Sequence, residues 1–420
     1  MIINKKLNCG VRIVMEEIPY VQSVSIGIWV KAGSVDETAK NSGISHFIEH
    51  MVFKGTHTRS AAEIASQTDA IGGQINAFTT KECTCFYGRV LDIHLPQLSD
   101  ILCDMFFHPR FDDADVQSER GVIMEEIDMY EDAPEDLVSE RLITAIYRGS
   151  SLSRPILGRK ASLDAVTGAS LREYMDSHYS PDRIVIAISG SFSPSDLEFF
   201  RDRFSAIPVL RKRRIPSVSC SPAVISKKKP VEQNHLCIGF PGLSVSDDRR
   251  FALQLLSGIL GGSVSSRLFQ TVREKHGLCY SIYTFGASYI DTGIFGIYTA
   301  LGRESEDGAL RMIFDEIRRF KEDGITDEEL ICAREQAKAN VLMSLESTSA
   351  RMNRLGKNEL FLGHIADPDE IIALYDAVTK DDIRALGECC LDIGSLSFSA
   401  VGRVKNAEDY RQTIDNMIAG

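Results

Sequence analysis

The chain has 420 residues, of which 44% are hydrophobic and 25% charged, so it is long enough for two or more folded domains and is neither disordered nor fibrous. Its 47 basic and 59 acidic residues give a net charge of −12, which argues against a nucleic-acid partner. Since no stretch approaches the roughly 18 apolar residues of a membrane span, we expect no membrane partner either.

The two halves of the chain show the same order of predicted elements. In the first half, a strand pattern at 24–30 is followed by a helical stretch and then by strands at 74–80 and 84–91. In the second half, strand patterns lie at 236–240, 281–288 and 293–300, with Ile238 following Ile26 by 212 positions. This repetition predicts an α+β fold with two homologous α/β-sandwich domains, each a mostly antiparallel sheet covered by helices.

Prolines and basic residues mark the boundary between the halves. Four prolines lie at 208–230, together with basic clusters at 211–214 and 227–229, which is typical of a solvated linker. We therefore expect an N-terminal domain at 1–210, a linker at 211–230 and a C-terminal domain at 231–420. Further helices are expected at 112–131, 136–147, 195–204, 305–323, 326–348 and 368–388, the one at 326–348 beginning after the N-cap Thr326.

The strongest chemical signal is an H-x-x-E-H motif formed by His46, Glu49 and His50. The pair Asn41-Ser42 is expected to cap a helix here, and Gly55 to end it, so both imidazoles project from one face one turn apart. This spacing suits Zn²⁺, with Glu49 beside the ligands without being one. The alternative is a pair of surface histidines on an amphipathic helix.

A catalytic zinc needs a third protein ligand, and the candidates lie in the acidic segment 118–128. Glu119 and Glu126 are seven positions apart and share one helix face, whereas spacing alone does not choose between Glu125 and Glu126. Gly121 within this predicted helix suggests the close approach of another helix. The alternative for this segment is an acidic, solvated helix.

Several motifs spread over essentially the whole chain resemble the inverzincin, pitrilysin-type metallopeptidases, and most closely the β-subunit of the mitochondrial processing peptidase and its bacterial relatives. The matching segments lie at 46–56, 72–79, 119–126, 155–158, 178–181, 265–269 and 273–280.

The resemblance implies a zinc-dependent endopeptidase that cleaves short or unfolded polypeptides, as processing peptidases do. It assigns Glu126 as the third zinc ligand and Glu119 as a carboxylate that steadies a ligating histidine. Glu49 becomes the general base. One zinc per chain is expected, because the second half reads L-Q-L-L-S-G-I-L-G at 253–261, where the repeat would carry the metal motif.

The same resemblance implies how a peptide substrate is held. The strand at 73–80 would offer a free edge to an extended substrate, with Asn76, Ala77 and Phe78 in contact with it. Arg273 and Tyr280 would contact the substrate carbonyl and the developing oxyanion. In this family two such domains form half of a clamshell chamber, so we expect a homodimer in which Arg273 and Tyr280 serve the partner's zinc site.

Two other functions compete with this interpretation. A non-catalytic scaffold or regulatory subunit of the same fold would have an incomplete site, whereas here every expected residue is present. A metal-binding module would need a closed site with four ligands, for which no fourth His or Cys has suitable spacing. Ten scattered cysteines without a C-x-x-C pair, and an N-terminal stretch unlike a signal peptide, predict a cytoplasmic protein.

Overall fold

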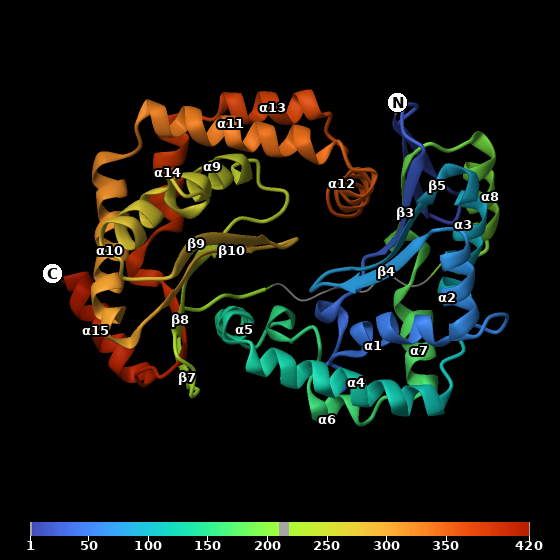
Figure 1. Cartoon of the computed structure of the whole chain (residues 1–420), viewed down its shortest axis with the longest axis horizontal. Coiled ribbons are helices and arrows are strands. Elements are labelled where there is room, and N and C mark those ends of the chain that lie inside the picture. The colour runs from blue at the N-terminus through green and yellow to red at the C-terminus, as the bar shows by residue number, and fades with distance from the viewer. Residues whose placement is uncertain (1, 210–217, 420) are drawn as a thin grey trace. The chain divides into compact units, whose positions relative to one another are not determined.

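The computed structural model describes residues 2–209 and 218–419, which form two compact units (Figure 1). The first unit comprises Met1–Ile127, Arg154–Pro216 and Met343–Ala366, and the second comprises Asp128–Ser153, Ser217–Leu342 and Asp367–Gly420, as far as these ranges are described. Each unit therefore contains a segment from the opposite half of the sequence.

The first unit is built on a six-stranded sheet in which only the pair β2 and β6 is parallel. In spatial order its strands are β1 (Ile2–Lys6), β2 (Arg12–Glu17), β6 (Ile184–Gly190), β3 (Ser23–Val30), β5 (Thr84–Leu91) and β4 (Gln74–Thr79). The strand β4 lies at one edge, beside β5 alone.

The second unit repeats this plan with a five-stranded sheet, in the order β7 (Val224–Lys228), β11 (Ser397–Gly402), β8 (Asn234–Gly242), β10 (Gly293–Leu301) and β9 (Ser281–Ser288). Again one pair, β7 and β11, is parallel and the others are antiparallel. The strands β2-β6-β3-β5-β4 and β7-β11-β8-β10-β9 thus share one order and one set of directions. The predicted pair of homologous domains with mostly antiparallel sheets is confirmed.

Helices cover both sheets. Those of the first unit are α1 (Ile44–Met51), α2 (Ala61–Ala70), α3 (Leu95–Phe107), α6 (Lys160–Leu163), α7 (Gly168–His178), α8 (Pro194–Phe204) and α12 (Thr348–Phe361). Those of the second unit are α5 (Pro134–Ile146), α9 (Arg250–Gly261), α10 (Glu306–Asp323), α11 (Asp327–Ser344, whose last two residues fall in the first unit), α13 (Pro368–Ala377), α14 (Lys380–Cys390) and α15 (Ala407–Ala419). Helix α4 (Asp113–Asp132) begins in the first unit and ends in the second.

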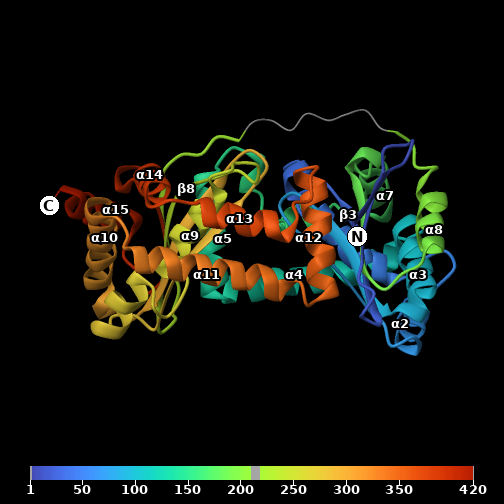
Figure 2. The same ribbon diagram turned by 90° about the horizontal axis from the view of Figure 1, so that it is seen from above.

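Alternation along β3 separates two cores in the first unit. Val24, Ile26, Ile28 and Val30 lie in the large core that contains residues of α1, α3 and α7, whereas Trp29 faces the other side of the sheet. That other side is covered by α12, which lies beside β3 in both views (Figures 1 and 2). The indole Nε1 of Trp29 donates to Met352 Sδ at 3.4 Å.

Glycine permits the close approach of α12 to the sheet. A Cβ atom at Gly27 of β3 would lie 2.5 Å from Met352 Sδ, and one at Gly356 of α12 would lie 2.2 Å from Trp29 Nε1. The second unit shows the same close approach of a helix to a strand glycine. Helix α5 packs on β8 and β11, and a Cβ at Gly239 of β8 would lie 2.9 Å from the Leu142 side chain of α5. Gly239 follows Gly27 by 212 positions, the offset that the sequence repeat predicts.

The compact units differ from the predicted domain ranges, because each unit includes a helix from the other half of the chain. The ranges 1–210 and 231–420 remain a prediction about the two repeats of the chain, whereas the compact units exchange the segments that carry α5 and α12. Within the predicted linker at 211–230, residues 211–217 lie outside the described residues and Val224–Lys228 forms β7. The basic cluster there is partly paired, because Lys227 contacts Glu131 and Lys229 Nζ lies 2.9 Å from Asp132 Oδ1.

Three helix predictions need correction. The helix expected at 326–348 ends at Ser344, although Thr326 caps it as predicted, in reciprocal hydrogen bonds with Glu329. The helix expected at 368–388 is two helices, because Thr379 caps a new helix through Asp382. The close helix approach expected at Gly121 is wrong, since a Cβ there would meet nothing within 4 Å.

No helix in the described ranges is both long and apolar enough to cross a membrane.

Candidate active site

Helix α1 carries the H-x-x-E-H motif, and its start is fixed by an acidic side chain rather than by the predicted Asn41-Ser42 cap. The N-cap residue is Gly43, whose φ of 94° favours glycine. The buried carboxyl of Glu37 accepts hydrogen bonds from the backbone N–H groups of Gly43, at 2.7 Å, and Ser45, at 3.0 Å. A 3₁₀ turn at Val52–Lys54 and Gly55, with φ of 117°, end the helical segment.

His46 and His50 lie one turn apart on α1, with ring centroids 4.5 Å apart. Helix α4 brings the Glu126 carboxylate to both: Oε2 lies 3.6 Å from His46 Nε2 and 3.5 Å from His50 Nε2. Glu125, the alternative that spacing left open, is exposed. Within 2–209 and 218–419, these three residues are the only group of three or more His, Cys, Asp or Glu side chains placed to share a metal ion.

The donor set fits zinc, which binds imidazole nitrogen and carboxylate oxygen in a catalytic site with three protein ligands. Burial, followed by the nearby His50, lowers the pKa of His46 to about 4, so this imidazole is neutral and free to bind a metal. The Oε2 atom of Glu126 is buried and has no hydrogen-bond partner among the described residues. A cation between the three groups would satisfy that oxygen.

Glu119, one of the predicted site residues, lies on α4 behind His50. It is 4% exposed, and its Oε1 is 2.8 Å from His50 Nδ1. Its Oε2 lies 2.5 Å from the ammonium nitrogen of Lys54. Burial would lower the pKa of His50, but the nearby carboxylates of Glu126 and Glu119 outweigh that effect and raise it. A carboxylate on the second ring nitrogen can orient a metal-binding imidazole, and Glu119 is placed to do so for His50.

Glu49 lies between the two histidines in sequence and faces the edge strand β4. Burial raises its pKa, while hydrogen bonding from Thr79, the last residue of β4, opposes the rise. Its Oε2 atom is buried without a hydrogen-bond partner among the described residues. A carboxyl group with a raised pKa, beside side chains that could bind a metal, is suited to act as a general base.

The three residues expected to hold substrate lie on β4 with different surroundings. Asn76 is exposed, and its Oδ1 accepts a hydrogen bond from the N–H of Ala77 at 2.8 Å. The ring of Phe78 packs against Trp29 at 5.4 Å and Tyr87 at 5.9 Å. The side chain of Phe78 is half-buried.

Arg273 and Tyr280 belong to the second unit, where the fold brings them together. Arg273 lies in a π-helical segment, Phe269–Lys275, and its guanidinium carbon is 4.6 Å from the Phe269 ring and 5.8 Å from the Tyr280 ring. Tyr280 is 71% exposed. An exposed phenol beside a cation can bind a carbonyl oxygen or an oxyanion.

Sequence reasoning missed Glu37, Lys54 and Thr79. Lys54 follows His50 by four residues, as His50 follows His46, so continuing the helical spacing would have found it. Glu37 and Thr79 left no such signal, because they reach α1 from a turn and from a strand edge.

Comparisons with known proteins match the chain to peptidase family models and to relatives named zinc proteases. Residues 12–160 match the family model described as insulinase (peptidase family M16), and residues 165–337 match that of the peptidase M16 inactive domain. YmxG of Bacillus subtilis, named an uncharacterized zinc protease, is 46% identical over 385 residues, or 91% of this chain and 94% of the relative. An uncharacterized zinc protease of Streptomyces coelicolor is 38% identical over 412 residues, or 96% and 90%.

Solved structures agree in fold. A peptidase M16 inactive domain from Pseudomonas fluorescens has a TM-score of 0.89 at 19% identity, and a protease from Helicobacter pylori 0.88 at 18%; each comparison covers 96% of this chain and 99% of the other. The resemblance to pitrilysin-type metallopeptidases is thus confirmed, whereas particular closeness to the processing peptidase β-subunit stays a prediction. On the family matches and the zinc protease relatives together, the chain belongs to peptidase family M16.

Proposed function

We propose that the protein is a zinc-dependent endopeptidase that cleaves short or unfolded polypeptides, in the manner of a processing peptidase. The observation that carries this proposal is the convergence of His46, His50 and Glu126 beside Glu49, a carboxyl group with a raised pKa. One zinc per chain is expected, because the second unit offers no equivalent cluster among its described residues. The match of residues 165–337 to an inactive domain supports this count.

His46, His50 and Glu126 would hold the metal. The chemistry that zinc supplies in such a site is that of a Lewis acid, which acidifies water and polarises the peptide carbonyl. Glu49 accepts the proton of the attacking water on its buried carboxyl group and then delivers it to the leaving amine. Glu119 keeps the His50 imidazole in one orientation while this happens.

The edge strand β4 would hold the substrate. An extended peptide can add to β4 as a further antiparallel strand, since β4 pairs with β5 on one side alone. The N–H of Ala77, now bound to the side chain of Asn76, is one of the donors such a peptide would use. Arg273 and Tyr280 would contact the carbonyl oxygen during cleavage.

We also propose that the working form is a cytoplasmic homodimer. A chain that carries both the metal motif and the pair Arg273 and Tyr280 can form two equivalent sites under twofold symmetry. All ten cysteines are free thiols, the state maintained in a reducing compartment, which supports a cytoplasmic location.

Metal analysis and peptide cleavage of the wild type and of the Glu49→Gln variant test the function. The wild type should contain about one zinc per chain and cleave members of a peptide library, as followed by mass spectrometry. Glu49→Gln should retain the zinc and lose at least about 100-fold in kcat, as expected for a general base. A zinc-loaded wild type that cleaves no peptide would instead indicate a scaffold or regulatory subunit.

A further inference from the structure

We propose that Lys54 is a positioning residue of the metal centre, which acts on His50 through Glu119. The inference rests on the proposed function only in taking His50 as a zinc ligand. Lys54 itself cannot bind a metal as an ammonium group, because its nitrogen has no free lone pair.

The geometry joins three side chains in a line. Lys54 Nζ lies 2.5 Å from Glu119 Oε2, and Glu119 Oε1 lies 2.8 Å from His50 Nδ1. Each oxygen of the carboxylate therefore has a partner, and the two contacts together restrict rotation of the carboxylate about the Cγ–Cδ bond of Glu119. Among the described residues Oε2 has no hydrogen-bond partner, so its recorded polar contact is the ion pair with Lys54.

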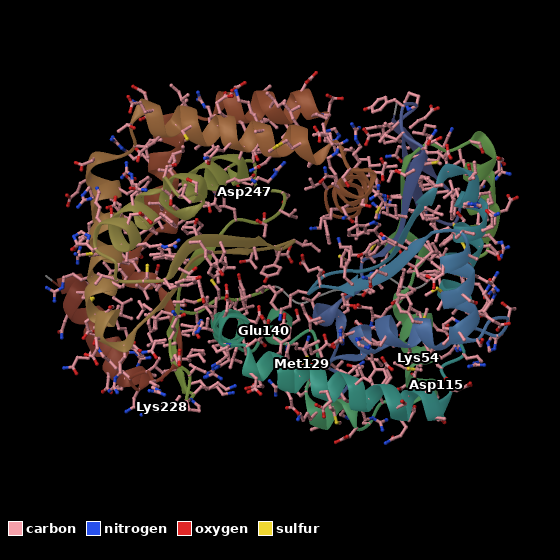
Figure 3. All side chains as sticks on the ribbon, viewed as in Figure 1. Lys54, Asp115, Met129, Glu140, Lys228 and Asp247 are labelled. Atoms are coloured by element: carbon pink, nitrogen blue, oxygen red, sulfur yellow. The ribbon has the colours of Figure 1, made fainter. Side chains whose placement is uncertain are left out.

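The position of Lys54 is itself fixed by the backbone around it. Lys54, which is labelled in Figure 3, ends the 3₁₀ turn that follows α1. It is followed by Gly55, whose φ of 117° ends the helical segment. The next residues are anchored, because the hydroxyls of Thr56 and Thr58 donate to the buried carboxylate of Asp104 at 2.6 and 2.7 Å. The Lys54 side chain thus starts from a rigid point, and with a fractional exposure of 37% it is partly shielded from water.

The ion pair with Lys54 compensates the buried negative charge of Glu119. Glu119 is 4% exposed, and an ionised carboxylate at that depth is costly unless it is paired. Lys54 supplies the compensating charge, and its contact with one oxygen leaves the other aimed at His50. Without Lys54 the carboxylate would lose one of its two contacts and could rotate, which would loosen the orientation of the His50 ring.

The test measures zinc affinity of the full-length chain without any peptide, by competition with a chromophoric chelator. Lys54→Met keeps the aliphatic stem and removes the charge, and we expect its zinc dissociation constant to rise about tenfold or more. Lys54→Arg should restore most of the affinity, because it returns a cationic donor. Lys40→Met, at an exposed lysine near the same helix, is the matched control and should bind zinc as the wild type does.

A double variant decides whether Lys54 acts through Glu119. If it does, Lys54→Met combined with Glu119→Gln should bind zinc within about twofold of Glu119→Gln alone. Unchanged affinity in Lys54→Met, or a double-variant loss equal to the product of the two single losses, would overturn the proposal while leaving the metal site intact. A wild type that binds no zinc would overturn the proposed function instead. Thermal unfolding of each metal-free variant shows that the comparison is between folded proteins.

Discussion

The carboxyl group of Glu37 accepts a hydrogen bond from the backbone N–H of Gly43, with Oε2 and the nitrogen 2.7 Å apart. Through this contact, a residue seven positions before the first residue of α1 satisfies a backbone N–H donor at the start of that helix. Burial raises the pKa of Glu37 to about 8, against the opposing effect of the hydrogen bonds from Gly43 and Ser45. The group that holds α1 is therefore mostly protonated at neutral pH.

This raised pKa predicts that stability falls as the pH rises. The unfolded chain releases the Glu37 proton near pH 4.5, whereas the folded chain keeps it up to about pH 8. Between these values the folded state binds more protons, so the contribution of Glu37 to the free energy of unfolding should decrease by up to about 1.4 kcal/mol per pH unit. Below pH 4.5 this contribution is fully present. Urea unfolding at pH 5, 6, 7 and 8 would show it as a wild-type stability that falls relative to Glu37→Gln; a constant difference between the two proteins would contradict the prediction.

Glycine substitutions should have opposite effects at two helical positions. Gly356→Ala places a Cβ atom 2.2 Å from the Trp29 indole nitrogen, so we expect a loss of about 1–3 kcal/mol in the free energy of unfolding. The Cβ atom added by Gly121→Ala on α4 meets nothing within 4 Å. This variant should raise the free energy of unfolding by up to about 1 kcal/mol, because alanine favours the helix more than glycine does. Denaturant unfolding measures both. Equal effects at the two positions would show that α12 does not approach β3 as described.

Complementation between inactive variants tests the proposed homodimer. His46→Ala and Tyr280→Phe are unfolded together, mixed and refolded. If Arg273 and Tyr280 serve the partner's zinc site, half of the dimers are mixed and each has one complete site, so about a quarter of the wild-type activity should return. If the residues act within one chain, every site lacks one component. Absence of recovery in a mixture that contains mixed dimers by mass analysis would exclude action across the dimer and leave the zinc assignment standing.

Pairing at the β4 edge predicts a preference for extended substrates. A protein substrate should be cleaved faster after its disulfides are reduced and alkylated than in its native form, because only the unfolded chain can add to β4 as a strand. A flexible peptide should be cleaved more slowly once its backbone nitrogens are methylated near the cleavage site. Both comparisons are followed by mass spectrometry, and rapid cleavage of the native protein would argue against strand addition.

The sequence predicted what depends on local patterns. The metal-binding spacing of His46 and His50, the strand alternation around Ile26 and the cap at Thr326 all concern residues within a few positions of one another. The helix α12 was missed because its partner Trp29 is 323 positions from Met352, and no local pattern contains that contact. The choice between Glu125 and Glu126 needed the rotation of α4, which its weak apolar pattern does not fix. Glycine at 121 looked like a packing site but is simply exposed.

The position of α12 in the sequence has a consequence for folding during synthesis on the ribosome. The strands of the first sheet are complete once β6 ends at Gly190, yet the helix that covers Trp29, Val14 and Val185 ends only at Phe361. About 170 residues must be synthesised in between, which at about 5–20 residues per second leaves this apolar face uncovered for about 10–30 s. The second sheet has no such delay, because α5 is made before the strands that it covers. During synthesis, the first sheet is therefore exposed to aggregation through its uncovered apolar face for longer than the second sheet.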